Sequence, residues 1–445
     1  MKLRAFIACV VCRTTHGILR LIKRGATALP GALALKIYPG ILSLAAEGVR
    51  IIAVTGTNGK TTSCRMLEKM LSDDGEDVLL NRSGANLRKG IATELILNLS
   101  LFGRPKKRTA VIECDEAAAR TVLGEIRPAV LLVTNLFKDQ MDRYGSVAAP
   151  FEAIKAGLIK SPKTLLCANA DSPFAAMFAA QIPNECRFFG FRSGVKKSAD
   201  SGESGECPRC GARLSYRFVS YANLGDYRCM RCGLKRPAPW LTADDYIKGE
   251  GLSLCACGRS FWIKPALPGL HNAYNAAGAV TAALSAGVSA EAVQSGAESF
   301  GCGFGRMEKL ALGNAGAEMI LVKNAAAVNR TLSLLALDRS PKTVVFIQNA
   351  RAGDGRDLSW LDDADFESLE RRVKAERIIL SGEAADALVM RAEKAGLKFE
   401  TAPAELLPDI LSDEERKIYL LPSYTAMLQL RGEIVRRFGG KEFWQ

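Results

Sequence analysis

The sequence lacks the features that would place it across a membrane. No stretch approaches the roughly 20 consecutive apolar residues that a transmembrane helix needs, so we expect no membrane-spanning segment. The basic, apolar stretch at 3–24 is a poor match to a signal peptide, because Arg4 and Arg13 leave a short apolar core without a clear cleavage site. Two alternatives stay open for this stretch: an amphipathic helix on a membrane surface, or a helix packed on the domain behind it.

Acidic residues are scarce relative to basic ones. The chain has 60 Lys and Arg against 47 Asp and Glu, a formal net charge of +13. This excess favours acidic partners, such as nucleotides, nucleic acid, anionic lipid or a phosphorylated substrate, without choosing among them. A content of 48% hydrophobic residues is that of a folded globular protein. At 445 residues the chain exceeds what one hydrophobic core supports, so we expect two or three domains.

The 13 cysteines do not form a disulfide-type pattern. Four of them make two C-x-x-C pairs, Cys207 with Cys210 and Cys229 with Cys232, and the rest are scattered. A glycine after each pair permits a tight turn, and four thiolates close a tetrahedral site. The pattern therefore predicts a structural zinc site in a reduced, cytosolic protein. Nearby Cys255 and Cys257 are either packing residues or alternative ligands.

Basic and aromatic residues surround these cysteines, which is also typical of zinc ribbons that bind nucleic acid. The ribbon is inserted within the chain and is not appended as a tail. We therefore favour an inserted structural element or a partner contact, and we expect no nucleic acid. The basic residues are Arg209, Arg213, Arg228, Arg231, Lys235 and Arg236.

A phosphate-binding loop is the strongest local signal. Residues 54–62 read Val-Thr-Gly-Thr-Asn-Gly-Lys-Thr-Thr, after an apolar run and before a helical pattern. Backbone N–H groups around Gly56 and Gly59 can face phosphate oxygens, Lys60 can reach the β- and γ-phosphates, and the Thr61 hydroxyl can ligate Mg²⁺. Val54 stands where the long form of this motif has glycine. The loop predicts ATP binding through Thr57, Asn58, Gly59, Lys60, Thr61 and Thr62.

Strands and helices alternate from about residue 50, which predicts a mostly parallel sheet covered on both faces. Ligands of such sheets gather at the carboxyl ends of the strands. Glu113 and Asn135 end two apolar runs and should approach the phosphates beside Lys60. A carboxylate there commonly holds Mg²⁺, so Glu113 and Asp115 are candidates; a solvated acidic turn is the alternative. The expected strands are 51–54, 110–112, 129–133 and 164–167.

Two further segments carry candidate residues. Asp139 and Asp142 are three residues apart and would share one face of a helix. His271, one of only two histidines, and Asn272 open a helix and could either contact the nucleotide or only cap that helix.

Composition divides the chain into regions. We expect an N-terminal basic amphipathic segment at 1–48, a central ATP-binding domain at 49–310 with a zinc-ribbon insertion at about 200–262, and a C-terminal α/β domain at 311–445. Polar residues at 193–205 are typical of a linker. Strands of the last domain are expected at 319–322, 343–347, 377–380 and 418–421.

Together these residues resemble the Mur ligase superfamily. The resemblance rests on the loop at 55–62, Glu113, the segment from Asn135 to Asp142, and the helix start at His271 and Asn272. Within the superfamily the sequence is most similar to the MurT family. That similarity lies in the inserted four-cysteine ribbon and in the segments 223–237, 305–308, 321–324, 354–360 and 424–427.

The resemblance implies a Mur-ligase-like central domain, a Rossmann-like C-terminal domain and one half of a two-protein enzyme. A GatD-type class-I glutaminase partner would release ammonia from glutamine. This chain would use ATP and Mg²⁺ to convert the D-glutamate α-carboxylate of the lipid II stem peptide into an acyl phosphate, which ammonia attacks to give D-isoglutamine. Such a protein would be cytoplasmic and peripheral at the inner face of the cell membrane, because lipid II carries a pyrophosphate there.

The resemblance also implies residue roles. Lys60 and Thr61 would bind phosphates and Mg²⁺, and Glu113 would hold Mg²⁺. Asn272 would contact the adenine and Arg306 a phosphate. Asp354, or as second choice Asp357, would orient the glutaminase's catalytic histidine; a simple turn aspartate is the alternative. The sequence departs from the family pattern at Gln140, where many members have histidine, and at Ala325 and Ala327, where proline and glycine are expected.

Two other functions remain as alternatives. One is a stand-alone ligase of the Mur or folylpolyglutamate type that adds an amino acid without a glutaminase. The other is a zinc-ribbon nucleic-acid binder with a P-loop motor, although the chain shows no helicase-like acidic motif.

Overall fold

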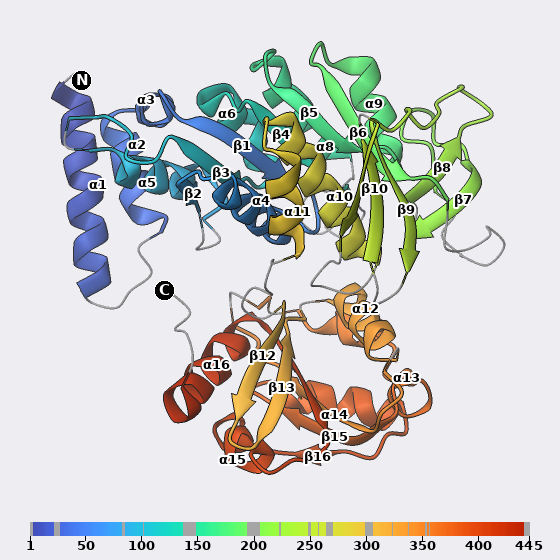
Figure 1. Cartoon of the computed structure of the whole chain (residues 1–445). Coiled ribbons are helices and arrows are strands. Elements are labelled where there is room, and N and C mark those ends of the chain that lie inside the picture. Colours follow the sequence, from blue (N-terminus) through green and yellow to red (C-terminus); the bar gives the residue numbers. More distant parts are fainter. Residues whose placement is uncertain are drawn as a thin grey trace. The chain divides into compact units, whose positions relative to one another are not determined.

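The computed structural model forms two compact units, residues 1–300 and 301–445 (Figure 1). The structure describes residues 3–21, 27–81, 85–100, 102–136, 148–193, 205–221, 224–247, 251–256, 258–263, 270–298, 306–322, 324–336, 338–351, 354–355 and 357–439.

The first unit is built on a nine-stranded sheet in the order β11-β10-β9-β6-β5-β4-β1-β3-β2. Every pair from β2 to β9 is parallel, whereas β10 and β11 are antiparallel to their neighbours. The predicted mostly parallel sheet is therefore confirmed. The strands are β1 (Arg50–Thr55), β2 (Val78–Leu80), β3 (Thr109–Glu113), β4 (Val130–Val133), β5 (Leu165–Asn169), β6 (Cys186–Phe191), β9 (Leu241–Ile247), β10 (Gly251–Ala256) and β11 (Arg259–Ile263).

Helices cover both faces of this sheet, so its central strands are buried on both sides (Figure 1). α4, α10 and α11 pack together on one face, while α3, α5, α6, α8 and α9 lie on the other. Their bounds are α3 (Ile41–Ala46), α4 (Lys60–Asp73), α5 (Arg88–Asn98), α6 (Glu116–Ile126), α8 (Ala148–Ile159), α9 (Pro173–Gln181), α10 (Leu270–Ser285) and α11 (Ala290–Glu298).

The N-terminal stretch forms α1 (Leu3–Leu21) and α2 (Leu29–Ile37). One face of α1, with Ala5, Ala8 and Cys12 fully buried, packs on α2 and α5 and joins the main core. Of the two alternatives for this stretch, packing on the domain behind it therefore describes one face of the helix. The opposite face is exposed. None of the helices in the described part of the chain is long and apolar enough to cross a membrane.

A small antiparallel pair, β7 (Ser215–Tyr221) and β8 (Leu224–Arg228), is inserted between β6 and β9. One C-x-x-C pair precedes β7 and the other follows β8. The three strands that follow, β9 to β11, belong to the main sheet, although the predicted insertion extends to about residue 262.

The second unit is a six-stranded sheet in the order β12-β13-β17-β14-β15-β16. Only the β12–β13 hairpin is antiparallel. Helices α12 to α14 cover one face and α15 and α16 the other, as expected for a Rossmann-like domain. The elements are β12 (Arg306–Leu312), β13 (Ala315–Ile320), α12 (Ala325–Leu335), β14 (Lys342–Ile347), α13 (Ser368–Arg371), β15 (Ala375–Ser381), α14 (Ala385–Lys394), β16 (Glu400–Thr401), α15 (Leu407–Leu411), β17 (Lys417–Pro422) and α16 (Tyr424–Phe438).

Candidate nucleotide, metal and partner sites

The predicted phosphate loop connects the end of β1 to the start of α4. Gly56 has a φ of 125° and Gly59 a φ of 86°, conformations that favour glycine. A Cβ on Gly56 would lie 2.3 Å from Oγ1 of Thr134, and one on Gly59 only 2.0 Å from Oδ1 of Asn275. The positive φ favours glycine at both positions, and at Gly56 a Cβ would also lie 2.8 Å from the Asn135 carbonyl oxygen.

Residues at the end of β4 hold this loop through hydrogen bonds. The Asn135 carbonyl accepts a hydrogen bond from the Thr57 amide at 2.8 Å, and its side-chain Oδ1 accepts one from the Asn58 amide at 3.1 Å. The Thr134 hydroxyl donates to the Asn58 carbonyl at 2.7 Å. The sequence places Asn135 near the phosphates, and the structure shows that it holds the loop in shape.

Lys60 lies in the first turn of α4 and is held by three acceptors, the longest contact being 3.5 Å to the Thr57 carbonyl. Its ammonium donates to the Gly56 carbonyl at 2.6 Å and to Oε1 of Glu116 at 3.2 Å. Glu116 is only 1% exposed, and its other oxygen, Oε2, has no hydrogen-bond partner among the described residues. Glu116 was not predicted from the sequence; its position in the first turn of the helix after β3 is the signal that could have found it.

Thr61 and Glu113 form an oxygen-rich pair at the same edge of the sheet. The Thr61 hydroxyl donates to Oε2 of Glu113 at 2.8 Å, and the Asn86 amide donates to Oε1 at 3.2 Å. A hydroxyl and a carboxylate are hard oxygen ligands that suit Mg²⁺. Asp115, the other candidate, instead caps α6 by accepting from the Ala117 amide at 3.0 Å. Its location favours a structural role.

The first turn of α10 lies against the phosphate loop. Asn272 and Asn275 are both buried, and the Asn275 amide donates to Oδ1 of Asn272 at 3.3 Å. Because Asn275 approaches Gly59 so closely, the start of α10 and the loop form one site. Arg306 pairs with Ile320 in the β12–β13 hairpin, and the structure does not describe its side chain. Asp139, Gln140 and Asp142 lie outside the described residues.

The four ribbon cysteines come together. Sγ of Cys207 lies 3.5 Å from Sγ of Cys232, the sulfurs of Cys210 and Cys229 are 3.6 Å apart, and all four lie within 4.8 Å of one another. A tetrahedral zinc ion with bonds of about 2.3 Å places sulfurs roughly 3.8 Å apart, so the donor set and spacing fit zinc. Backbone amide groups of Cys232 and Arg231 lower the pKa of Cys229 to about 6, whereas burial raises the pKa of Cys207 in the same cluster.

Cys255 lies apart from this cluster. It belongs to β10, between Thr242 of β9 and Ser260 of β11. Its position favours a packing residue. Cys257 lies outside the described residues.

A buried ion pair joins the ribbon to the domain beneath it. Nε of Arg236, which follows the second cysteine pair, donates to Oδ1 of the fully buried Asp171 at 2.7 Å. The Tyr274 hydroxyl of α10 donates to the other oxygen of Asp171 at 2.5 Å. Burial raises the pKa of Asp171, although Arg236 and these donors act to lower it. The ribbon therefore docks onto the segment after β5, to which Tyr274 of α10 is also bonded.

In the second unit, Asp354 sits in a well-held turn. Its Oδ1 accepts from the Thr425 amide at 2.6 Å, and its Oδ2 accepts from the Thr425 hydroxyl at 2.5 Å and from the Arg351 amide at 3.2 Å. Thr425 lies in the first turn of α16, where the helix dipole favours a negative charge. Asp357 is exposed, and hydrogen bonds from Ser359 lower its pKa.

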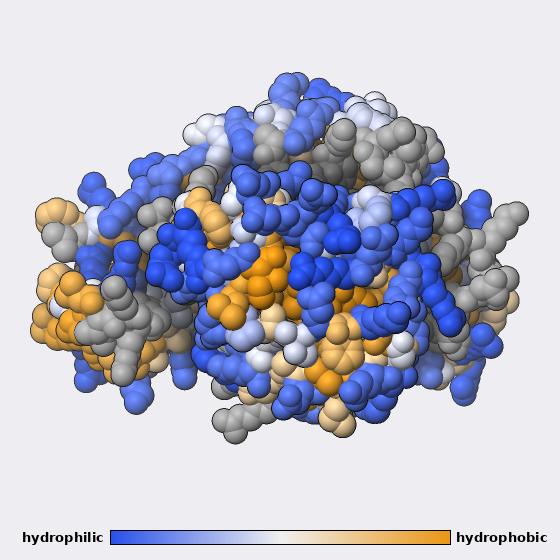
Figure 2. Space-filling model, turned by 90° about the horizontal axis from the view of Figure 1, so that it is seen from below, coloured by the Kyte–Doolittle hydropathy of each residue, from blue (hydrophilic) through white to orange (hydrophobic). Residues whose placement is uncertain are grey.

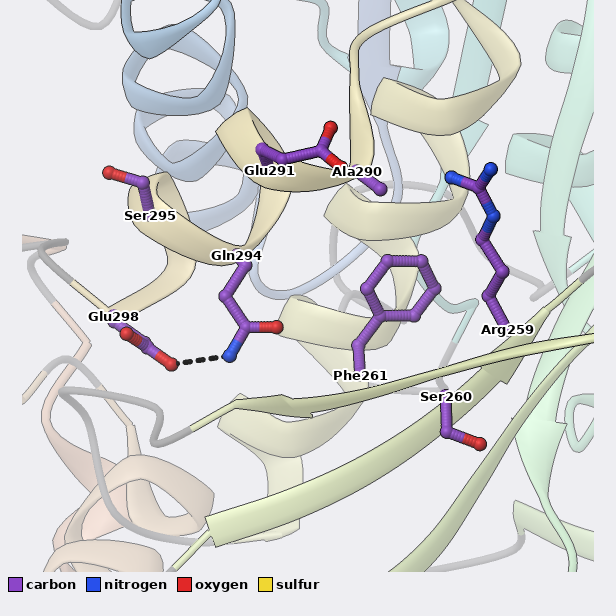
Figure 3. A pocket seen from close by; sticks show the side chains of 8 residues that line it. All are labelled: Arg259, Ser260, Phe261, Ala290, Glu291, Gln294, Ser295 and Glu298. Carbon is purple, nitrogen blue, oxygen red and sulfur yellow. Dashed lines mark hydrogen bonds between the residues drawn. The ribbon is translucent and has the colours of Figure 1, made fainter.

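A hollow of about 1070 Å³ lies between β11 and α11 (Figure 3). Arg259 lines it from the strand side and Glu291 from the helix, and Gln294 donates to Glu298 at 2.7 Å. None of the predicted site residues lines this hollow.

Comparison with known proteins identifies the fold. The Mur ligase middle domain matches residues 54–206. MurF from Acinetobacter baumannii superposes with a TM-score of 0.67 at 18% identity, covering 91% of this chain and 80% of that one. A pseudomurein peptide ligase type C from Methanothermus fervidus gives 0.64 at 21% identity, covering 87% and 79%. The chain has the Mur ligase fold.

More specific matches give the family. The MurT ligase C-terminal family matches residues 321–427. The MurT subunit of lipid II isoglutaminyl synthase (glutamine-hydrolyzing) from Streptococcus pneumoniae is 32% identical over 98% of both chains. Its counterpart from Staphylococcus aureus strain COL is 32% identical over 94% of both. The chain belongs to the MurT family, and the resemblance stated from sequence is confirmed.

Proposed function

We propose that this chain is the ATP-dependent ligase subunit of a two-chain enzyme that amidates the D-glutamate α-carboxylate of the lipid II stem peptide. The observation that carries the proposal is full-length similarity to relatives named as subunits of a glutamine-hydrolysing lipid II isoglutaminyl synthase. The phosphate loop, with its Thr61–Glu113 pair, supplies the chemistry that such a ligase needs.

The reaction requires an activated carboxylate, because a carboxylate is a poor electrophile. Transfer of the ATP γ-phosphoryl group to the α-carboxylate makes an acyl phosphate, and attack by ammonia then releases phosphate and leaves the amide. Lys60 and the N–H groups of the loop bind the phosphates, and Arg306 adds positive charge to them. Thr61 and Glu113 would hold Mg²⁺, which when bound would supply positive charge to the transferred group. Asn272 contacts the adenine.

Lys60 is positioned by acceptors of the same site. Its ammonium donates to the Gly56 carbonyl and to Glu116. A bound phosphate would compete with these acceptors for the three N–H donors. The buried Glu116 carboxylate keeps the ammonium beside the loop.

Ammonia comes from a GatD-type class-I glutaminase that forms a heterodimer with this chain. A glutaminase cysteine needs a histidine base, and an acid orients that histidine as in other catalytic triads. Asp354 is our choice for this acid and Asp357 the second. Three donors fix the Asp354 carboxylate, and its remaining lone pairs can accept one more hydrogen bond.

The rest of the chain supports this site. The four ribbon cysteines hold a structural zinc ion, and the protein acts at the inner face of the cell membrane, where lipid II is found. We expect no nucleic acid among its partners. The predicted domains at 49–310 and 311–445 remain our proposal for the functional division, with 1–48 as an N-terminal extension.

Reconstitution tests the proposal. The chain is co-expressed with a class-I glutaminase and incubated with lipid II, ATP and glutamine, and the product is analysed by mass spectrometry. We expect the small mass decrease that replacement of a hydroxyl by an amino group produces, dependent on both ATP and glutamine. Addition of a whole amino acid without the glutaminase would instead support a stand-alone ligase, and no ATP-dependent change would refute the proposal.

A further inference from the structure

The outer face of α1 is an apolar stripe without a partner in the described part of the chain. With 3.6 residues per turn, Leu3, Ile7, Val10, Ile18 and Leu21 fall on one side of the helix, opposite the packed Ala5, Ala8 and Cys12. Leu3 is 74% exposed, Ile18 59% and Leu21 83%. Figure 2 shows a group of apolar residues at the left edge of the view, where α1 lies in Figure 1.

Positive charge borders this stripe. Arg4 and Arg20 are exposed and, by the same periodicity, lie on its opposite margins. The helix contains no acidic residue. An apolar stripe with arginines on both margins is the pattern of a helix that lies in the interface of an anionic membrane.

A second exposed segment that combines an apolar residue with basic residues adjoins α1. Arg13 of α1 donates to the Ser100 carbonyl at 3.2 Å and also bonds the Leu99 carbonyl, at the end of α5. The chain then turns outward at Phe102, which is 90% exposed, and continues through exposed basic residues. These are Arg104, Lys106 and Arg108.

A second copy of the chain is a less suitable occupant of this face. A helix pair along the stripe would place Thr14 and Gly17 at its centre, where well-packed pairs have large apolar residues. It would also bring the arginines of two helices together without any acidic residue of α1 to pair with them. An anionic lipid surface satisfies both the apolar residues and the arginines.

We propose that the outer face of α1, together with the Phe102 turn, is a membrane-docking surface that inserts into an anionic lipid leaflet. This inference rests on the proposed function for its purpose, since it would bring the active site to a lipid-linked substrate. The surface itself is a property of residues 3–21 and 102–108 and can be tested without any catalysis.

The test uses full-length protein in complex with its glutaminase and measures flotation with vesicles. One vesicle type contains phosphatidylcholine with phosphatidylglycerol, and the other contains phosphatidylcholine alone. The variant L3Q/I7Q/I18Q removes apolar area but no charge, and all three side chains are exposed, so folding should be unaffected. The matched control L406Q/M390Q/I410Q changes three exposed apolar residues of the other unit.

We expect the wild type and the control to bind anionic vesicles, and the α1 variant to bind at least about tenfold more weakly. Arg4→Gln and Arg20→Gln should each weaken binding by about fivefold, since a basic residue near an anionic surface contributes roughly that factor. Equal binding of the α1 variant and the wild type would overturn the proposal. The proposal would also be overturned if light scattering showed that two copies of the complex associate in the wild type but not in the α1 variant. That result would assign the face to a second copy of the chain.

A lipid II analogue with a short, water-soluble chain separates this proposal from the proposed function. The wild type and the α1 variant should amidate the soluble analogue equally, while only the wild type should act efficiently on lipid II in vesicles. Absence of amidation with either substrate would refute the function and leave the vesicle-binding result standing. Equal action of both proteins on vesicle-borne lipid II would refute the docking role.

Discussion

Acidic side chains lie both beside the phosphate loop and in the Asp354 turn, but the groups that bond to them differ. Glu113 and Glu116 are nearly inaccessible and already engaged with Thr61 and Lys60 of the same site. Asp354 is held by backbone and hydroxyl donors at the start of α16, without a cation bonded to its carboxylate among the described residues. The first site therefore contains an ion pair, Lys60 with Glu116, whereas the second presents a fixed carboxylate.

This difference teaches how a two-chain enzyme divides its chemistry. Phosphoryl transfer needs paired charges, which cost less to bury than single ones. An acid that serves another protein must instead be rigid and keep an accessible oxygen. Changes that separate the two activities test this division.

The largest effect is expected for Asp354→Asn. Asparagine keeps the shape of the side chain but loses its charge, so glutamine hydrolysis by the complex should fall by up to about 10⁴-fold, as in other triads. ATP binding, measured by calorimetry, should stay unchanged. Asp357→Asn is the matched control and should retain hydrolysis within about twofold of the wild type, as surface changes usually do. The reverse pattern would transfer the role to Asp357.

Lys60→Met should have the next largest effect, on the other half reaction. Loss of the ammonium should lower ATP-dependent amidation by about 10³-fold, the scale of one lost transition-state donor, while glutamine hydrolysis persists. The variant also leaves Glu116 buried without its cation, which should cost about 3 kcal/mol of unfolding free energy.

The double variant Lys60→Met with Glu116→Gln separates the loss of amidation from the loss of stability. It should recover most of the stability in urea unfolding and none of the amidation. Recovery of activity would show that Lys60 acts only through Glu116.

Arg236→Leu tests whether the ion pair between the ribbon and Asp171 contributes to the unfolding free energy of the domain that contains the phosphate loop. Removing the guanidinium leaves Asp171 buried without its ion pair, so we expect a loss of about 3 kcal/mol in unfolding free energy. Arg217→Leu is the control, because Arg217 is 86% exposed and its distance to Asp226 is 4.0 Å; its effect should stay within about 0.5 kcal/mol. Equal effects would mean that the ribbon is not anchored by Asp171.

The smallest effect is expected for Asp115→Ala, which removes the cap of α6. The cost should be about 1 kcal/mol in thermal unfolding. The Mg²⁺ concentration for half-maximal amidation should not change, whereas Glu113→Gln should raise it. A shift in the Asp115→Ala variant would restore Asp115 as a candidate ligand.

The features predicted best from the sequence are those formed by consecutive residues. The loop at 55–62, both cysteine pairs and strands β1, β3, β4 and β5 each depend on neighbouring residues, so their patterns can be recognised in the sequence. Strand β9 was missed because Asp244 and Asp245 interrupt its apolar pattern. β10 and β11 fall in the cysteine-rich segment that was assigned to the insertion.

Long-range contacts could not be predicted in the same way. Glu116 reaches Lys60 across 56 positions, and Thr425 fixes Asp354 across 71 positions. The anchor between Arg236 and Asp171 spans 65 positions. These pairings are set by how strands and helices pack, so the sequence can mark a position such as Glu116 but not the residue that it contacts.

The central claim is that this chain activates a carboxylate that its partner's ammonia then attacks. Lipid II whose D-glutamate α-carboxylate carries heavy oxygen tests it directly, with the released phosphate analysed by mass spectrometry. The account predicts that one heavy oxygen moves into inorganic phosphate for each amide formed, and that Lys60→Met abolishes the transfer. Amide formation with only unlabelled phosphate would contradict the acyl phosphate and with it the assigned role of the loop.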